Sequence, residues 1–274
     1  MKKPFNHFVI TRFNLKQNIW KKDRTGAKVN NEEWLKDRYA LFEKYCYPSL
    51  KNQSEQNFKW LVYFDEDTPE YFKLKNEQLH QKYSNFNAIY VKDFKTFEQE
   101  LSNQIKKYIE VKKDYLITSR IDNDDCFHRE AVKVIQNHFA EQNNTIIDLC
   151  NGLSLQTENG FKLSIKRNVQ SGPFISLIER ATVENANFIT VYDREHNHWI
   201  GDAEFININS GYYWLQIIHG RNISNNLNNH LTFNKKYLKG YEFIGKIKFS
   251  FKYYLFIVLK KMKIIALFKF LKNG

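Results

Sequence analysis

Residues 115 to 125 read Tyr115-Leu116-Ile117-Thr118-Ser119-Arg120-Ile121-Asp122-Asn123-Asp124-Asp125, a strand-like apolar run that leads into three carboxylates within four residues. Carboxylates this close repel one another unless a cation or another positive group lies among them. Mg²⁺ and Mn²⁺ take oxygen ligands and bridge carboxylates to a diphosphate. Alternatively, Asp124 or Asp125 only caps the helix that follows. The segment predicts a divalent metal site at the end of a strand.

The sequence on both sides of this segment alternates between strand-like and helix-like patterns. Apolar residues recur at helical spacing between short apolar runs, which lie at residues 7–13, 58–64, 88–91 and 115–121. This alternation predicts a parallel sheet with helices on both faces. After residue 139 we expect short strands with a hairpin at Glu158-Asn159-Gly160, a helical turn at 174–180 and a strand at 188–192. The predicted fold class is α/β with a mixed sheet.

Polar residues follow the predicted parallel strands at the edge where open α/β sheets bind ligands. They are Thr11, Arg12, Asp65 and the run from Arg120 to Asp125. The guanidinium groups of Arg12 and Arg120 suit phosphate or ribose oxygens, although a structural ion pair with a nearby acid would also explain them. This edge is the predicted ligand site.

The composition describes one globular domain with a basic tail. The chain has 274 residues, is 42% hydrophobic and carries a net charge of +12, and eight of its lysines lie beyond Gly245, where no acid occurs. The charge therefore belongs first to the tail, and without a recognition motif we expect no nucleic-acid partner. Three scattered cysteines and no apolar leader indicate neither a disulfide framework nor a signal peptide. These features fit a reducing cytoplasm.

The C-terminal segment, residues 241–274, interleaves lysines with aromatic and aliphatic residues. Its longest uncharged stretch, Tyr253 to Leu259, is far shorter than the roughly 20 apolar residues that span a bilayer. We expect a basic amphipathic helix that lies on an anionic membrane surface, at the cytoplasmic face of the bacterial inner membrane. The alternative is a helix packed on the catalytic domain, which we expect to comprise residues 1–240.

The run Asp122-Asn123-Asp124-Asp125 resembles the DxD element of glycosyltransferases with the GT-A fold. Five ordered blocks, spread over about residues 7 to 226, resemble more narrowly the bacterial family described as putative rhamnosyltransferases. The blocks are His7–Phe13, Arg38–Gln53, Ile117–Asp125, Ser176–Glu179 and Trp214–Asn222. The resemblance implies a GT-A-type fold and transfer of a sugar, with rhamnose as one candidate.

The resemblance also implies roles for particular residues. Mn²⁺ or Mg²⁺ would be held by Asp122, Asp124, Asp125 and His219, although His219 could instead be a surface or hydrogen-bonding histidine. The nucleotide-sugar donor would contact the residues Thr11, Arg12, Phe13, Asp65, Arg120, Asp122 and Arg221. The acceptor would be a glycan or lipid-linked glycan of capsule, lipooligosaccharide or O-antigen.

An inverting transfer requires a general base for the acceptor hydroxyl. We prefer Glu179, which lies in a family-like block, over Asp202, which follows Trp199-Ile200-Gly201; either could be an ordinary surface acid. A metal-dependent nucleotidyltransferase or phosphohydrolase would also use clustered carboxylates. A basic RNA- or membrane-binding module is the rival that is not an enzyme.

Overall fold

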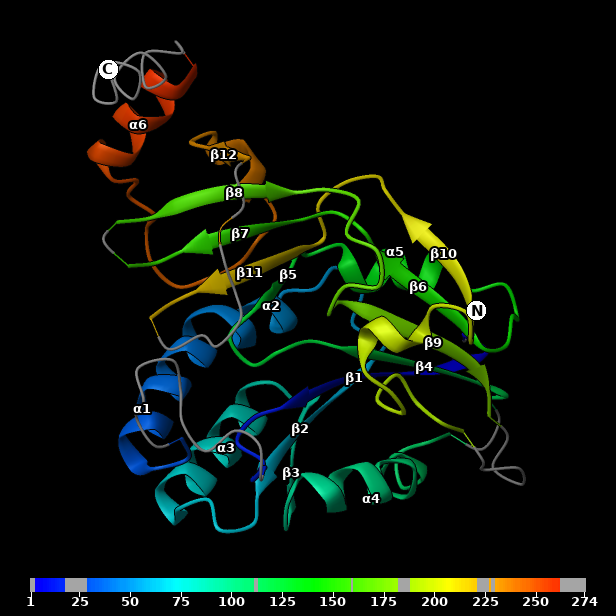
Figure 1. Ribbon diagram of the computed structural model, residues 1–274. Helices are drawn as coiled ribbons and strands as arrows, with labels where there is room; N and C mark the ends of the chain where they lie inside the picture. The colour runs from blue at the N-terminus through cyan, green and yellow to red at the C-terminus, as the bar shows by residue number, and fades with distance from the viewer. Residues whose placement is uncertain are drawn as a thin grey trace.

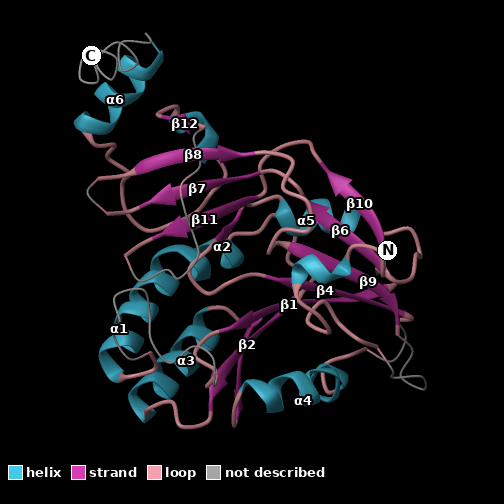
Figure 2. Ribbon diagram, in the orientation of Figure 1, coloured by secondary structure: helices cyan, strands magenta, loops and turns pink. Residues whose placement is uncertain are grey.

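The computed structural model describes residues 3–17, 29–110, 113–158, 160–181, 188–220, 227 and 230–261. Its elements form two β-sheets and their covering helices (Figures 1 and 2). The larger sheet has the order β10-β6-β9-β4-β1-β2-β3. The bounds are β1 (Phe5–Arg12), β2 (Lys59–Asp65), β3 (Phe86–Val91), β4 (Tyr115–Arg120), β6 (Thr145–Leu149), β9 (Ile175–Arg180) and β10 (Glu204–Ile208).

Strands β3, β2, β1 and β4 are parallel, as the alternating pattern predicts. Strand β9 is antiparallel to both of its neighbours, β4 and β6, and β10 lies parallel to β6 at the edge. The predicted mixed α/β sheet is therefore confirmed. The predicted helical turn at 174–180 was wrong, because these residues form β9, and residues 188–192 form no strand.

Helices cover both faces of the larger sheet. On one face, an apolar cluster joins Val9, Trp60 and Ile117 to a first set of helices. On the other face, a second cluster joins Phe8, Ile10 and Leu61 to α4 (Phe94–Lys106) and to the segment around η2 (His196–Trp199). The first set comprises α1 (Glu32–Leu41), η1 (Phe42–Cys46), α2 (Tyr47–Lys51), α3 (Glu70–Lys82) and α5 (Ala131–Asn137). This leaves the carboxyl ends of the parallel strands as an edge between the two layers.

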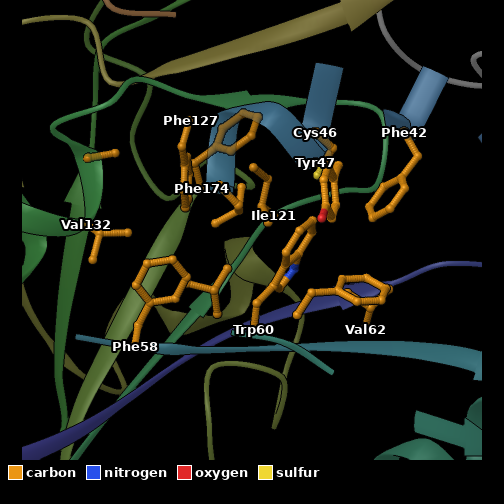
Figure 3. Packing of buried hydrophobic residues seen from close by; sticks show 14 of the residues in the cluster. Phe42, Cys46, Tyr47, Phe58, Trp60, Val62, Ile121, Phe127, Val132 and Phe174 are labelled. Atoms are coloured by element: carbon orange, nitrogen blue, oxygen red, sulfur yellow. The ribbon is translucent and has the colours of Figure 1, made fainter. Parts of the chain in front are cut away.

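Ile121 fixes the chain immediately before the acidic run. It is fully buried and belongs to the same apolar cluster as Trp60, Phe127 and Phe174, which surround it in Figure 3. Burying an aliphatic side chain contributes about 1.5–3 kcal/mol. The backbone that carries Asp122 is therefore held in place by apolar packing on the preceding residue.

The smaller sheet has the order β12-β8-β7-β11-β5 and lies beside the larger one (Figure 1). Its strands are β5 (Cys126–Phe127), β7 (Gly152–Gln156), β8 (Lys162–Lys166), β11 (Trp214–Ile218) and β12 (Leu231–Thr232). Trp214 links the sheets, since its ring stacks on Phe174 at 4.6 Å and its Nε1 donates to the Leu149 carbonyl at 2.6 Å. A Cβ at Gly152 would lie 2.0 Å from this ring, so only glycine fits there.

The structure does not show a break at residue 240. Tyr241 is buried, and its hydroxyl donates to the carbonyls of Tyr212 and Trp214 at 2.8 and 2.9 Å. Tyr241, Phe243, Ile247 and Phe249 share the apolar cluster of the smaller sheet, so the residues that directly follow position 240 pack on this sheet. The 3-10 helix η3 (Lys235–Leu238) precedes it.

Helix α6 (Phe251–Lys261) lies beside β12 and β8 (Figure 1). Tyr253 and Ile257 are buried, and the Tyr253 hydroxyl donates to the Leu163 carbonyl at 2.6 Å. Part of the tail is thus packed on the domain, as the alternative reading of its sequence predicted. No helix in the portion that the structure describes is long and apolar enough to cross a membrane.

Candidate active site

The acidic run connects the two sheets. It leaves β4 in the larger sheet and enters β5 in the smaller one, which pairs with β11. The amide of Asp125 donates to the Asp122 carbonyl at 3.3 Å, so the run forms a tight turn at the carboxyl edge of the parallel strands. This position is where the sequence predicted a ligand site.

Asp124 lies at the centre of the run and is buried. Its Oδ2 accepts from Arg38 Nη1 at 2.7 Å and contacts His219 Nε2 at 3.0 Å. Burial opposes ionisation of this carboxyl, but the Arg38 charge and the His219 contact outweigh it and lower its pKa to about 2. The structure therefore brings together Asp124 and His219, two of the four predicted metal ligands, with Asp124 as a carboxylate.

Asp125 has a different partner. Its Oδ1 accepts from the Ile217 amide at 2.8 Å, and so takes the place of a ladder carbonyl just before β5 begins. Its Oδ2 is buried with no hydrogen-bond partner. Burial is the larger cause, and repulsion from Asp124 and Asp122 the smaller one, of a pKa of this carboxyl that is raised well above its usual range. Through this contact with β11, Asp125 fixes the connection between the two sheets.

Asp122 is half-buried, and its carboxylate makes no hydrogen bond or ion pair within the described residues. The same part of the chain contains no group of three or more His, Cys, Asp or Glu residues arranged to hold a metal. The four predicted ligands are thus not assembled around one point. The structure provides one close pair, Asp124 and His219, and the neighbouring carboxylate of Asp122.

Two of the predicted donor-binding arginines converge. Arg12 and Arg120 both contact the Tyr192 ring, with guanidinium carbons 5.1 and 5.0 Å from its centroid. Arg120 Nη1 is 4.0 Å from Glu195, and its buried Nε has no hydrogen-bond partner. The two guanidinium groups form a positive patch at the ends of β1 and β4, suited to phosphate oxygens.

Asp65 ends β2 at the same edge. Its carboxylate contacts Lys16 Nζ at 3.0 Å and accepts from the Asp67 amide at 2.9 Å. The remaining oxygen, Oδ2, is buried without a partner. A buried acceptor of this kind suits an N–H group of a nucleobase, because an unsatisfied buried oxygen is costly until a donor reaches it.

Two other predicted donor-binding residues serve the core. The Thr11 hydroxyl is buried and accepts from Trp60 Nε1 at 3.0 Å, and the Phe13 ring packs against Tyr39 and Phe64 at 4.5 and 4.7 Å. Both side chains are thus engaged with residues of the first apolar cluster, and their contacts with a donor stay predictions. The seventh residue, Arg221, lies outside the described residues.

Glu179 is not at this edge. It pairs with Leu116, four residues or about 13 Å before Arg120 along β4. Its two carboxylate oxygens accept from the amides of Ile189 and Thr190 at 2.8 and 3.0 Å. The position does not fit the predicted general base, because the antiparallel direction of β9 carries residue 179 away from the acidic run. Glu179 holds the chain segment that returns over the sheet.

Asp202 also lies apart from the acidic run. It precedes β10, three strand spacings or about 14 Å from β4, and its exposed carboxylate pairs with Arg194. The structure therefore does not bring this second candidate base to the metal ligands either.

The family comparison agrees with the ordered blocks. The family described as "Putative rhamnosyl transferase" matches residues 5–230. The chain belongs to this family. The match spans every strand from β1 to β11 and so includes Asp124, Arg38 and His219. The family predicted from the sequence is confirmed.

Solved structures of other proteins are similar at low identity. TarS from S. aureus, residues 1–349, is 13% identical over 77% of this chain and 60% of its own, with a TM-score of 0.40. The mannosyltransferase PcManGT from Pyrobaculum calidifontis, in complex with GDP-Man and Mn²⁺, is 8% identical over 79% of this chain and 56% of its own, with a TM-score of 0.41. The chain thus spans less than two thirds of either protein. No curated protein matches it significantly.

Two residues near the carboxyl edge of the parallel strands were not predicted from the sequence. In the sequence Arg38 is only the first residue of a family-like block, and no pattern in α1 shows which basic residue faces Asp124. Asp148 is the penultimate residue of β6 and is buried, with Oδ2 accepting from the Ser171 amide at 2.6 Å and Oδ1 unpartnered. Burial raises its pKa to about 6. An acid inside a buried strand, Thr145–Leu149, was the available signal.

The position of Glu179 generates a pH prediction. Burial raises its pKa to about 7 in the folded protein, above the usual value near 4.5. The folded state therefore retains the proton longer, and this contribution to stability, present below pH 4.5, is lost as the pH rises towards 7. In Glu179→Gln that loss should be absent. The difference between the two free energies of unfolding, wild type minus variant, should therefore fall by up to about 1.4 kcal/mol per pH unit across this window.

Denaturant unfolding of both proteins from pH 4 to pH 8 measures this difference. Transfer activity of the variant should stay within a few-fold of wild type, since Glu179 lies away from the acidic run. A pH-independent difference would refute the structural role. A large drop in turnover with unchanged nucleotide binding would restore Glu179 as the base.

Proposed function

We propose that this protein is a metal-dependent glycosyltransferase that moves a sugar, with rhamnose as the candidate, from a nucleotide-sugar donor to a bacterial surface glycan. The observation that carries the proposal is the Asp124–His219 contact of 3.0 Å at the carboxyl edge of the parallel strands. The ends of β1, β4 and β2 at the same edge carry the Arg12 and Arg120 guanidinium groups and the unpartnered oxygen of Asp65. The proposed metal ligands, the proposed phosphate-binding cations and the proposed nucleobase acceptor thus share one edge.

The side chains fit a divalent ion whose coordination is completed by substrate. Asp124 supplies a carboxylate oxygen and His219 an imidazole nitrogen, and Mn²⁺ accepts both. Mg²⁺ is commonly held by one or two carboxylates together with substrate phosphates, so a site with few protein ligands suits a diphosphate-bound ion. Asp122 is near enough in sequence to contribute. When bound, such an ion neutralises charge on the departing nucleoside diphosphate.

The chain's own residues would do the rest of the work. Arg12 and Arg120 would bind the diphosphate oxygens and stabilise the charge that develops on them as the bond between the sugar's anomeric carbon and the diphosphate breaks. Asp65 Oδ2 would accept from the nucleobase and set its orientation. Tyr192 holds both arginines beside its ring, which limits their motion before the donor arrives.

We propose an inverting transfer with Asp148 as the candidate base in place of Glu179 and Asp202. Asp148 is a buried acid near this edge that has no other proposed role, and a carboxyl with a pKa of about 6 suits proton abstraction near neutral pH. Asp148→Asn should lose transfer while nucleotide binding is retained; equal turnover in the variant would exclude the assignment.

The metal role predicts the behaviour of Asp124→Asn. The variant should lose release of nucleoside diphosphate from sugar nucleotides, and Mn²⁺ should no longer increase the thermal stabilisation that UDP, GDP or dTDP provides. Glu100→Gln, an exposed acid on α4, is the matched control and should behave as wild type. Full activity of Asp124→Asn, or of wild type in excess EDTA, would contradict the metal role. Release of pyrophosphate or monophosphate would instead indicate a nucleotidyltransferase or phosphohydrolase.

We also propose that α6 docks the protein peripherally on the anionic cytoplasmic face of the inner membrane, where a lipid-linked acceptor would lie. Tyr253 and Ile257 face the domain, whereas Lys252 and Leu255 are exposed, so the helix has a basic and apolar outer side. Basic residues contribute about 1 kcal/mol each near an anionic surface, and apolar residues add burial in the interface.

Leu255→Glu should therefore weaken binding to anionic liposomes in a sedimentation assay without loss of thermal stability. Leu74→Glu is the control, because Leu74 on α3 is similarly exposed, at 50% against 45% for Leu255. Binding by wild type should weaken with salt. Equal binding by the two variants would contradict docking through α6.

A further inference from the structure

Arg38 is the residue of this edge that has no assigned task. It lies in the last turn of α1, and its side chain is 15% exposed, with its guanidinium over the Trp34 ring at 4.9 Å. Its Nη1 donates to Asp124 Oδ2 at 2.7 Å and to Asn123 Oδ1 at 3.1 Å. Arg38 thus forms its ion pair with the same carboxylate that, in the proposed function, binds the metal.

The two roles of Asp124 compete for one atom. Oδ2 already contacts both Arg38 Nη1 and His219 Nε2, and a carboxylate oxygen offers about two lone-pair directions. A divalent ion bound to Oδ2 would also lie close to the guanidinium, where two positive charges in a buried site repel strongly. An ion can therefore take this oxygen easily only when the Arg38 charge moves or is neutralised.

Asn123 links this contact to the phosphate-binding patch. Its Nδ2 donates to the carbonyls of Phe13 and Arg12 at 2.8 and 3.1 Å, while its Oδ1 accepts from Arg38. The guanidinium of Arg38 is thus tied to the end of β1, from which Arg12 extends. A diphosphate bound at that end would offer Arg38 an alternative partner, because guanidinium groups pair with phosphate as well as with carboxylate.

We propose that Arg38 occupies the cation position at Asp124 in the metal-free protein and gives it up when a diphosphate arrives with the metal. The proposal rests on the metal role of Asp124 proposed above. In it, Arg38 makes metal and nucleotide binding cooperative: the ion alone must displace a charge, whereas the diphosphate accepts that charge. Such coupling is reciprocal, so each ligand tightens the other by the same factor.

Mn²⁺ binding measured by the electron paramagnetic resonance of free Mn²⁺, with and without UDP, GDP or dTDP, tests the proposal. In wild type the nucleotide should tighten Mn²⁺ binding by about tenfold or more. In Arg38→Gln, which keeps a donor but removes the charge, Mn²⁺ alone should bind about tenfold more tightly than in wild type, and the coupling factor should shrink towards one.

Three variants make the result specific. Arg38→Lys retains the charge and should keep weak binding of Mn²⁺ alone, and Lys36→Gln removes one charge from an exposed position of the same helix and should match wild type. Arg38→Met repeats the test should Arg38→Gln fail to fold. Asp124→Asn reports whether the ion binds at Asp124 at all.

The outcomes separate the two proposals. Unchanged or weaker Mn²⁺ binding in Arg38→Gln, with binding abolished in Asp124→Asn, overturns the role of Arg38 and leaves the metal site standing. Mn²⁺ binding that is equal in wild type and Asp124→Asn overturns both. A tenfold gain in Lys36→Gln as well would show a general charge effect and also overturn the role of Arg38.

Discussion

The buried carboxylate of Asp124 holds together three parts of the chain that lie far apart in sequence. Arg38 reaches it from α1, His219 reaches it from the end of β11, and Ile121 anchors the turn that carries it. A buried carboxylate is costly unless paired, so removing one partner destabilises the fold by far more than a surface ion pair would. The same pairing supplies an ionised oxygen ligand at the edge where donors would bind. Stability and proposed chemistry therefore depend on one residue.

The arrangement of the strands explains why this edge carries so many polar groups. Parallel strands β1, β2 and β4 place Arg12, Asp65 and Arg120 at one edge, while β5 and β11 bring the smaller sheet against it. Asp125 completes the junction through the Ile217 amide. A sheet junction of this kind encloses the acidic run on two sides, which limits water around Asp124 and strengthens its charge interactions.

The sequence predicted the edge better than it predicted the individual side chains. An acidic run after a buried strand and the alternating pattern were enough to locate Asp124 and Asp65, because position at a strand end determines the sheet edge. The face of the sheet is set by packing, so Thr11 and Phe13 could not be distinguished from Arg12. The short apolar run at 174–180 fits a helical turn and a strand equally well, and its antiparallel direction moved Glu179 away from the edge. The Arg38 contact depends on how α1 packs, which no local pattern encodes.

The most direct test of this account is the position of a bound ion. Crystals grown with Mn²⁺ and a nucleoside diphosphate, measured at a wavelength where manganese scatters anomalously, should show one strong peak within about 2.0–2.3 Å of an Asp124 carboxylate oxygen and of His219 Nε2. The diphosphate should contact the same ion, with Arg38 no longer on Asp124 Oδ2. A peak at another place on the chain, or a diphosphate bound at this edge without manganese at Asp124, would contradict the account.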